Sequence, residues 1–422
     1  MIARKKYRLS DVARVDISSV DKKKKEGESL VRLCNFTDVY HNWAITAGIA
    51  NNFMEASANA SEIEKFTIKK GQVAFTKDSE TRDDIGISTY IADNFEGVLL
   101  GYHCALITPD KNKLSGKYLN AFMHSAYIQK YFENSASGSG QRYTLSLETL
   151  ENMPLLLPSL EEQQVIGDLF SSIDRKISFN RSINRDLEAL AKQIYDYWFV
   201  QFDFPDENGR PYKSSGGMMV WNDDLKREIP EGWNNGIFAD IANITMGQSP
   251  DGSSYNEEGI GSIFYQGSTD FGVRFPSVRM FTTSPSRFAK QGDILMSVRA
   301  PVGAVNIANS DCCIGRGLSA INSKIGSITY IYYVVHYLKV RFDSLNTAGT
   351  TFGSITKDEL FKLPVVVPSD NVIERFESIC KPIFGKQMEI GFEMEQLTKQ
   401  RNELLPLLMN GQVTVNPDLS AH

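Results

Sequence analysis

The sequence predicts an α+β protein made of two related α/β units, each followed by one long helix. Three observations predict this fold. Similar segments recur in the same order in the two halves of the chain, short β-prone runs fill the first part of each half, and a long run with helical periodicity closes each half. With 422 residues, 42% of them hydrophobic, the chain is long enough for two or more domains with sizeable cores.

The repeat is the first element of this argument. Met153–Ser159 (MPLLLPS) reappears as Leu363–Ser369 (LPVVVPS), and because prolines bound a short apolar run in both copies, we expect an extended connector at each place. Four further matches occur in the same order: Leu9–Ala13 with Phe238–Ala242, Asn35–Asp38 with Gly267–Asp270, Lys70–Phe75 with Gln291–Met296, and His124 with His336. The chain is therefore two versions of one unit.

A helical pattern follows each connector. Ser159 occupies an N-cap position with Glu162 three residues later, as in a capping box, and apolar residues then recur at three- and four-residue steps. The second run starts at Ser369 and is less regular, with Pro382 and Pro406 inside it. Each run predicts a helix of about 40 residues, or roughly 60 Å. We expect the two helices to form an antiparallel coiled coil, since the second unit supplies the long return path between them.

These patterns divide the chain into five segments. The expected order is a globular domain, a helix, a surface linker rich in turn residues, a second globular domain and a second helix: residues 1–158, 159–200, 201–228, 229–368 and 369–415.

Composition excludes several classes of protein. No apolar run approaches the ~18 residues of a membrane span, and no apolar stretch follows the basic N-terminus, so we expect a cytoplasmic protein without a signal peptide. The five cysteines form no C-x-x-C pair and have no neighbouring histidine cluster, which predicts buried thiols rather than a disulfide framework or a metal site. The net charge of −6 argues against a simple DNA-binding domain.

Two stretches of the chain resemble a known family. Tyr195–Pro205, continued by Ile229–Trp233, resembles the central conserved region of the specificity subunits of type I restriction–modification systems. Thr347–Thr356, followed by Leu363–Pro368, is similar to the region of that family that leads into its second conserved helix. The order, spacing and internal repeat extend the resemblance to the whole chain.

This resemblance implies a DNA-reading subunit without catalytic activity. Its two globular portions would be target-recognition domains, each reading one half of a bipartite, asymmetric site in double-stranded DNA. The conserved helices would space them and dock two methyltransferase subunits, after which two restriction/translocase subunits can join. The chain itself would hold no cofactor, since S-adenosylmethionine, ATP and Mg would be bound by those partners. Helix length would set the unread gap between the half-sites, so a shortened helix should shrink that gap.

Reading bases needs side chains that donate or accept in pairs, such as Arg to guanine and Asn or Gln to adenine. Gly-rich, loop-like surroundings in the second unit favour the following base or phosphate contacts: Gln248, Ser249, Tyr265, Gln266, Arg299 and Arg316, with Thr350 and Thr351 for phosphates. In the first unit, which departs further from the family pattern, the candidates are Asn35, Lys77, Arg82, Gln141 and Arg142. The alternative for each position is a turn former or a solvated surface residue.

An enzyme should show its chemistry in the sequence. The chain has no G-x-x-x-x-G-K-[ST] phosphate loop, no H-E-x-x-H zinc motif and no G-x-S-x-G elbow. The matched histidines His124 and His336 lie on apolar segments, which favours core or interface positions. Two alternatives stay open: a coiled-coil protein-interaction scaffold that no longer reads DNA, which the acidic balance supports, and a self-sufficient modification enzyme with an unfamiliar site.

Overall fold

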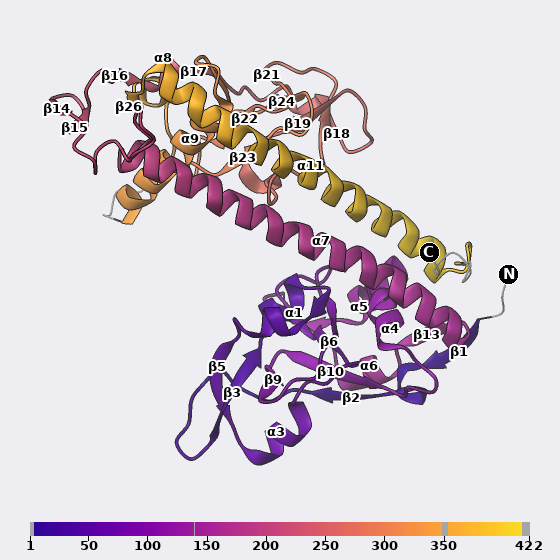
Figure 1. The fold of residues 1–422 in the computed structure, drawn as a ribbon. Helices are drawn as coiled ribbons and strands as arrows, with labels where there is room; N and C mark the ends of the chain where they lie inside the picture. The colour runs from indigo at the N-terminus through magenta and orange to yellow at the C-terminus, as the bar shows by residue number, and fades with distance from the viewer. Residues whose placement is uncertain (1–3, 139, 348–352, 416–422) are drawn as a thin grey trace. The chain divides into compact units, whose positions relative to one another are not determined.

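The computed structural model describes residues 4–138, 140–347 and 353–415, with side chains of 340–347 left out of the description. The chain divides into two compact units: unit 1 comprises residues up to 179 together with those from 395 onward, and unit 2 comprises residues 180–394 (Figure 1). Because this division falls within both long helices, each unit contains half of each helix. The boundaries of the five segments expected from the sequence stay a prediction.

Unit 1 is built around a five-stranded sheet in the order β2-β10-β6-β8-β4, joined by smaller sheets β5-β3-β9, β11-β12-β7 and β1-β13. Its strands are β1 (Lys5–Arg8), β2 (Ala13–Ile17), β3 (Ser29–Cys34), β4 (Ala44–Ile45), β5 (Met54–Ala58), β6 (Val73–Thr76), β7 (Asp78–Ser79), β8 (Ser88–Ile91), β9 (Val98–Leu100), β10 (Cys104–Pro109), β11 (Ser137–Gly138), β12 (Tyr143–Thr144) and β13 (Pro154–Leu157). Its helices besides the long ones are α1 (Phe36–His41), α2 (Ala47–Ala50), α3 (Ala60–Phe66), α4 (Gly116–Met123), α5 (Ala126–Ser135) and α6 (Leu147–Glu151).

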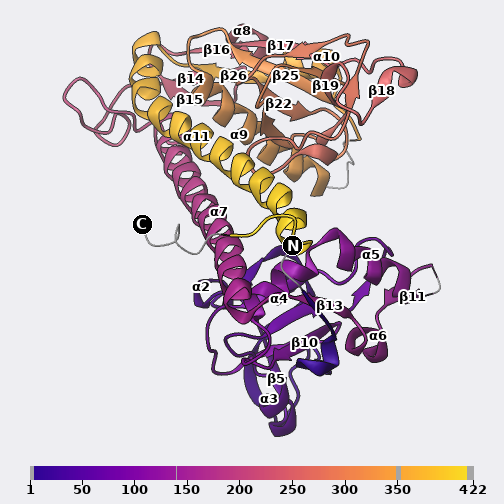
Figure 2. The same ribbon diagram turned by 90° about the vertical axis from the view of Figure 1, so that its right-hand side faces the viewer.

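Unit 2 repeats this plan with sheets β17-β25-β22-β23, β18-β20-β19-β24-β21, β16-β26 and β14-β15. Its strands are β14 (Met219–Asn222), β15 (Arg227–Pro230), β16 (Asn234–Ile237), β17 (Ala242–Met246), β18 (Tyr255–Asn256), β19 (Ser262–Tyr265), β20 (Phe281–Thr282), β21 (Phe288–Ala289), β22 (Ile294–Ser297), β23 (Val305–Ile307), β24 (Cys312–Ile314), β25 (Leu318–Ser323) and β26 (Pro364–Val367). Helices α8 (Phe238–Ile241), α9 (Ile328–Thr347) and α10 (Lys357–Phe361) complete it, and α9 lies against the sheet that contains β25 and β22 (Figure 2).

The two units share strand order as well as sequence. Strand β10 pairs antiparallel with both β2 and β6, and its counterpart β25 pairs in the same way with β17 and β22. A parallel pair, β3 with β9, recurs as β19 with β24. The Pro-bounded segments predicted as extended connectors are strands β13 and β26, which pair with the equivalent strands β1 and β16. The repeat predicted from the sequence is therefore a repeat of topology.

The long helices are α7 (Leu160–Tyr195, 36 residues) and α11 (Asp370–Met409, 40 residues), and a π-helical turn, η2 (Asp196–Val200), continues α7. The predicted N-cap is present, since the Glu162 backbone N–H donates to Ser159 Oγ over 3.2 Å. Pro382 and Pro406 lie inside α11 without ending it.

Within unit 2 the helices run antiparallel along one seam. Asn180 Nδ2 donates to Glu393 Oε2 over 2.8 Å, Gln387 Nε2 donates to Glu188 Oε2 over 2.9 Å, and the rings of Tyr195 and Phe376 lie 6.3 Å apart. Residue numbers thus rise on α7 as they fall on α11. In unit 1 the opposite ends of the two helices meet, where Ile166 and Phe170 share a core with Leu405, Leu408 and Met409. The predicted antiparallel pairing is confirmed.

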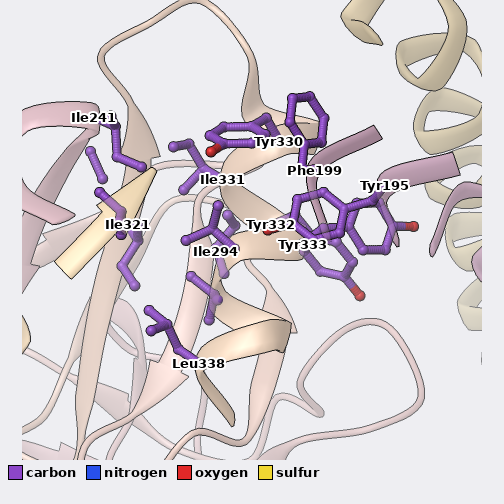
Figure 3. Close-up of a cluster of buried hydrophobic side chains, with 14 of the residues drawn as sticks. Tyr195, Phe199, Ile241, Ile294, Ile321, Tyr330, Ile331, Tyr332, Tyr333 and Leu338 are labelled. Carbon is purple, nitrogen blue, oxygen red and sulfur yellow. The ribbon is translucent and has the colours of Figure 1, made fainter. Parts of the chain in front are cut away.

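The largest core of unit 2 joins its sheet to the helices. In Figure 3 the rings of Tyr195 and Phe199, from α7 and η2, gather with Tyr330 and Tyr333 of α9. The segment expected as a surface linker contributes to this core: Phe202 and Phe204 are 1% and 6% exposed and pack against Trp233. The prediction of a purely surface linker is wrong there, because these two aromatic side chains have apolar area to bury despite their polar neighbours.

All five cysteines are buried free thiols, as expected. In the described residues, no helix is both long and apolar enough to cross a membrane, and no group of His, Cys, Asp and Glu side chains could hold a metal ion.

Candidate nucleic-acid interface

Among the residues that the structure describes, each unit has a cleft that is formed by loops at the strand ends and lined by polar side chains. The cleft of unit 2 has a volume of about 580 Å³ and is lined by Glu257, Phe264, Gln266–Asp270, Arg279, Met280, Arg299, Ala300, Arg316 and Gly317. The cleft of unit 1 has a volume of about 660 Å³ and is lined by Ser18, Ser19, Lys77, Asp78, Tyr102, His103, Ser137, Gly138, Arg142 and Thr144. We call them the unit 1 cleft and the unit 2 cleft.

The first wall of each cleft has the same backbone frame. Asp78, just after β6, pairs with Thr144, and Arg299, just after β22, pairs in the same antiparallel way with Ser354. The neighbouring hydrogen bonds also match: Leu145 N–H donates to the Lys77 carbonyl, and Ile355 N–H donates to the Val298 carbonyl, over 2.8 and 2.9 Å. Asp78 and Arg299 therefore occupy equivalent positions with opposite charge.

The second wall also repeats. Tyr102 precedes β10 and donates its backbone N–H to the Val20 carbonyl over 2.8 Å. Arg316 precedes β25 and donates its backbone N–H to Ser249 Oγ over 3.2 Å. Tyr102 and Arg316 are both exposed, so the same backbone position presents an aromatic ring in unit 1 and a guanidinium in unit 2.

Glycines bring the polar residues of the unit 2 cleft together. A Cβ on Gly317 would lie 2.6 Å from the Gln266 carbonyl oxygen, and one on Gly315 would lie 3.0 Å from Gln266 Cα. The loop that carries Arg316 therefore packs directly on the backbone of Gln266, and only glycine permits that approach. Gln266 and Arg316 are consequently exposed next to each other at the mouth of the cleft.

The charges of the unit 2 cleft are unequally neutralised. Arg279 Nε donates to Asp270 Oδ1 over 2.6 Å, and Asp270 is only 8% exposed, so this arginine is held by a carboxylate. Arg299 and Arg316 are exposed and form no ion pair with any residue that the structure describes. These two guanidiniums thus keep their donors for a ligand, and the geometry of a guanidinium matches an acceptor pair such as guanine O6 and N7.

Gln248 and Ser249 stand next to this site. Gln248 is exposed, and its backbone N–H donates to the Ile314 carbonyl over 3.0 Å, which fixes it beside the Arg316 loop. Thr350 and Thr351, the residues predicted to contact phosphates, lie outside the described residues.

Two of the predicted contacts are buried beneath the clefts. Tyr265 is 0% exposed, and its hydroxyl lies 3.4 Å from the Pro276 carbonyl. Asn35 is 7% exposed and stands at the N-cap of α1, where its backbone N–H donates to Asp38 Oδ2 over 2.8 Å. Tyr265 is the last residue of β19, and Asn35 directly follows β3. Their burial depends on their position relative to these strands, and a sequence that looks like a loop does not reveal it. Both side chains are therefore buried in this structure rather than exposed for contact with a base.

The unit 1 cleft is organised around one carboxylate. Asp78 accepts from Lys77 Nζ over 2.9 Å and from Arg142 Nη2 over 3.3 Å, and its Oδ2 lies 2.5 Å from His103 Nδ1. Burial opposes ionisation of Asp78, but hydrogen bonds from Thr144, Lys77 and His103 outweigh it, so that the pKa of this carboxyl is lowered. Lys77 and Arg142 are thereby largely neutralised, unlike the arginines of the unit 2 cleft.

His103 is a residue that the sequence did not single out, because it showed no partner. It adopts a left-handed backbone conformation, with φ of +72°, which is uncommon for a side chain with a Cβ and is often associated with functional sites. The internal repeat held the missing signal. Extending the alignment to the ends of β6 and β10 pairs Asp78 with Arg299 and Tyr102 with Arg316, which places His103 in the cleft.

Arg82 and Gln141 do not line the unit 1 cleft but lie near it. Both are exposed, and Gln141 belongs to the turn between β11 and β12. The Arg82 guanidinium lies over the ring of Tyr143, 5.2 Å from its centroid, on the small sheet that also carries Asp78. Of the other first-unit candidates, the half-buried Lys77 and the exposed Arg142 line the cleft, whereas Arg82 and Gln141 flank it.

Comparison with known proteins agrees with this architecture. The family model described as "Type I restriction modification DNA specificity domain" matches residues 4–189 and 230–405, one match for each copy of the repeat. The MjaX specificity subunit of Methanocaldococcus jannaschii is 30% identical over 367 residues, which cover 84% of this chain and 81% of that protein. The type I restriction enzyme HindI specificity subunit of Haemophilus influenzae is 23% identical over 420 residues, covering 83% and 88%.

A solved structure has a similar fold. The S subunit of the type I restriction–modification system from M. genitalium covers 96% of this chain and 96% of its own, with a TM-score of 0.58 and 16% sequence identity. At that identity the likeness concerns the fold alone.

Proposed function

Because the chain belongs to the type I restriction–modification DNA specificity family, we propose that its two clefts read the two halves of one bipartite DNA sequence. The chain is the DNA specificity subunit of such a system and is not its catalytic component. Side chains that line the two clefts read the bases. The observation that supports this proposal is that the same cleft occurs in both units with different side chains.

The unit 2 cleft has the chemistry to read guanine and adenine. Arg299 and Arg316 each present a planar set of donors suited to guanine O6 and N7 in the major groove, and Gln266 can form a donor–acceptor pair with adenine. Gln248 and Ser249 flank these side chains and suit contacts to phosphates, which fix the register without reading sequence. Thr350 and Thr351 stay candidates for the same phosphate role.

The unit 1 cleft has different chemistry at equivalent positions. Asp78 offers carboxylate oxygens that can accept from the cytosine amino group, in the place where unit 2 carries Arg299. Lys77, Arg142 and His103 supply donors around that carboxylate, and Arg82 and Gln141 lie at its margin. Because the two clefts differ in side chains, the two half-sites differ in sequence, and the recognised site is asymmetric.

Partners complete this function. The long antiparallel helices dock two methyltransferase subunits, and two restriction/translocase subunits join the assembly; S-adenosylmethionine, ATP and Mg belong to these partners. The net charge of −6 supports a division of labour in which partner subunits supply much of the positive charge that faces the DNA backbone.

The test is to co-express the chain with the methyltransferase subunit of the same system and to map methylated adenines across the genome. We expect methylation at one bipartite motif that disappears when the chain is omitted. Methylation by the chain alone would instead support a self-sufficient enzyme. A stable complex without any methylated motif would support the protein-interaction scaffold.

A further inference from the structure

Trp43 in unit 1 and Arg274 in unit 2 occupy the same position of the repeat. Strand β3 ends at Cys34 and β19 ends at Tyr265, so each residue lies nine positions beyond its strand. The backbone sets this register, which differs by one residue from the sequence match of Asn35 with Gly267: Tyr90 N–H donates to the Trp43 carbonyl over 2.9 Å, and Ile307 N–H donates to the Arg274 carbonyl over 3.0 Å. Tyr90 and Ile307 are themselves equivalent, since they pair with the first residues of β6 and β22.

Arg274 fastens its loop to three helices of unit 2. Its side chain is 5% exposed, and its Nη1 donates to Glu188 Oε2 of α7 over 3.1 Å and to the Tyr332 hydroxyl of α9 over 3.2 Å. The guanidinium also lies over the ring of Phe384 of α11, 4.6 Å from its centroid. Gln387 of α11 donates to the same Glu188 oxygen over 2.9 Å. The Glu188 carboxylate of α7 therefore binds both the loop that carries Arg274 and helix α11.

Trp43 fastens the equivalent loop in unit 1 to the equivalent helices. Its ring stacks on His124, which directly follows α4, with centroids 4.4 Å apart and an angle of 17°. Arg401 of α11 lies over the same ring at 5.2 Å, and Phe170 of α7 is 6.3 Å away. Both loops thus form a cation–π contact with α11, but in unit 1 the helix supplies the cation and in unit 2 the loop supplies it.

The reversed chemistry fits each loop to its own helix segments. A tryptophan at position 274 would leave Glu188 without its cation, and an arginine at position 43 would meet the cation of Arg401. The first exchange would leave the half-buried Glu188 carboxylate without its ion-pair partner, and the second would replace a cation–π contact by the repulsion of two cations. The two loops are therefore not interchangeable.

A short, rigid connection links the unit 2 anchor to its cleft. Gly267–Asp270 line the cleft, and Arg274 follows four residues later. Within this turn Ser277 N–H donates to the Asp270 carbonyl over 2.7 Å, and Asn306 Nδ2 donates to the Gly272 carbonyl over 3.0 Å. A shift of Arg274 therefore displaces one wall of the cleft.

In unit 1 the connection runs through α1. Helix α1 begins directly after Asn35, and the preceding Cys34 carbonyl accepts from Gly101 N–H over 2.8 Å. Gly101 is followed by Tyr102 and His103, which line the cleft. Trp43 lies two residues beyond the end of α1. It therefore fixes α1, and through Cys34 and Gly101 it positions the wall that carries Tyr102 and His103.

We infer that Trp43 and Arg274 are positioning residues that hold each base-reading cleft in register on its own segment of the helix pair. This inference rests on the proposed function. It assigns no contact with DNA to either residue, since both act through the loops they fasten. Substitution of one anchor should weaken discrimination between cognate and mismatched bases in one half-site and leave discrimination in the other half-site unchanged.

The experiment uses the full chain co-expressed with its methyltransferase subunit, with adenine methylation measured at cognate sites and at sites mismatched in one half. We expect Arg274→Met to raise methylation of sites mismatched in the second half about tenfold relative to cognate sites, with first-half discrimination unchanged. Trp43→Leu should do the reverse. Each variant is the matched control of the other, because each removes one side chain that packs on the long helices within its own unit.

Equal loss of discrimination in both halves, or no change in either, would overturn the inference. If Arg274→Met accumulates poorly, Arg274→Lys and Glu188→Gln test the same contact with smaller changes: each should give an intermediate effect confined to the second half. The proposed function is judged separately, since it fails only if the unmodified chain directs no bipartite methylation.

Discussion

Protonation of His124 should destabilise unit 1 as the pH falls. Its Nε2–H donates to the Ser88 carbonyl over 2.9 Å, and its ring is covered by Trp43. Burial lowers the pKa of His124 from 6.5 to about 4; the hydrogen bond to Ser88 opposes this shift, and the charge of Arg401 adds to it. The neutral imidazole is therefore the form that the fold accommodates.

The direction of the pH effect follows from this lowered pKa. Between about pH 6.5 and pH 4 the unfolded chain binds a proton at this histidine and the folded chain does not, so the stability contributed by the neutral ring is complete above pH 6.5 and declines below it. The difference of about 2.5 pKa units, at 1.36 kcal/mol per unit, corresponds to about 3 kcal/mol over the whole window and about 2 kcal/mol by pH 5.

The assay compares the wild-type chain with His124→Gln, whose amide can still donate to the Ser88 carbonyl but does not titrate. Urea unfolding is carried out at about pH 7.5 and pH 5, with hydrogen exchange of peptides from α4 and α5 as the readout. The exchange rates give the free energy of opening of unit 1. We expect the wild type to lose about 2 kcal/mol more than the variant over this range. Titration of His336 affects both proteins equally and cancels. Equal losses in the two proteins would refute the reasoning.

Three further predictions concern single substitutions. Arg316→Ala should cost about 1–3 kcal/mol of discrimination, roughly five- to 150-fold, at a guanine of the second half-site, measured by methylation of cognate and substituted sites. Asp78→Asn should free the cations it holds and steepen the salt dependence of DNA binding by the assembled complex by about one phosphate charge, measured by fluorescence anisotropy; an unchanged slope would contradict this. Gly167→Ala should destabilise unit 1 by about 1–3 kcal/mol, because its Cβ would lie 2.7 Å from Lys117 Cβ, whereas Gly385→Ala, with no atom within 4 Å, should be neutral or stabilising in thermal melts.

The long helices could be predicted from sequence because their evidence is local and periodic. An N-cap serine, a glutamate three residues later and apolar residues at helical spacing are all visible without a structure. The segment at 201–228 was less accessible, since turn residues dominate it while Phe202 and Phe204 are buried against Trp233. Whether an isolated aromatic side chain is buried depends on the tertiary fold, and no local sequence pattern predicts it.

The candidate site also contains residues that local sequence could predict and residues that only the fold brings together. Gly-rich surroundings drew attention to the loops of Arg316 and Gln266, where close backbone approach needs glycine. The same reasoning placed Tyr265 among the candidate DNA contacts, although it ends a strand with its side chain in the core. The link between Asp78 and His103 spans 25 residues of sequence and depends on strand register, so it became visible only in the fold.

The repeat makes the differences between the two units more informative than either unit alone. Backbone pairing at Asp78 and Arg299 coincides, so the scaffold is common, and our proposal that the two clefts read different bases rests on the change from carboxylate to guanidinium. The same comparison weakens the objection from net charge. A chain with a charge of −6 still presents two exposed guanidiniums without ion pairs in the described part of unit 2, while one carboxylate, Asp78, pairs with the cations of the unit 1 cleft. Sequence readout depends on where a few donors and acceptors stand, and total charge governs mainly the strength of nonspecific attraction to the phosphate backbone.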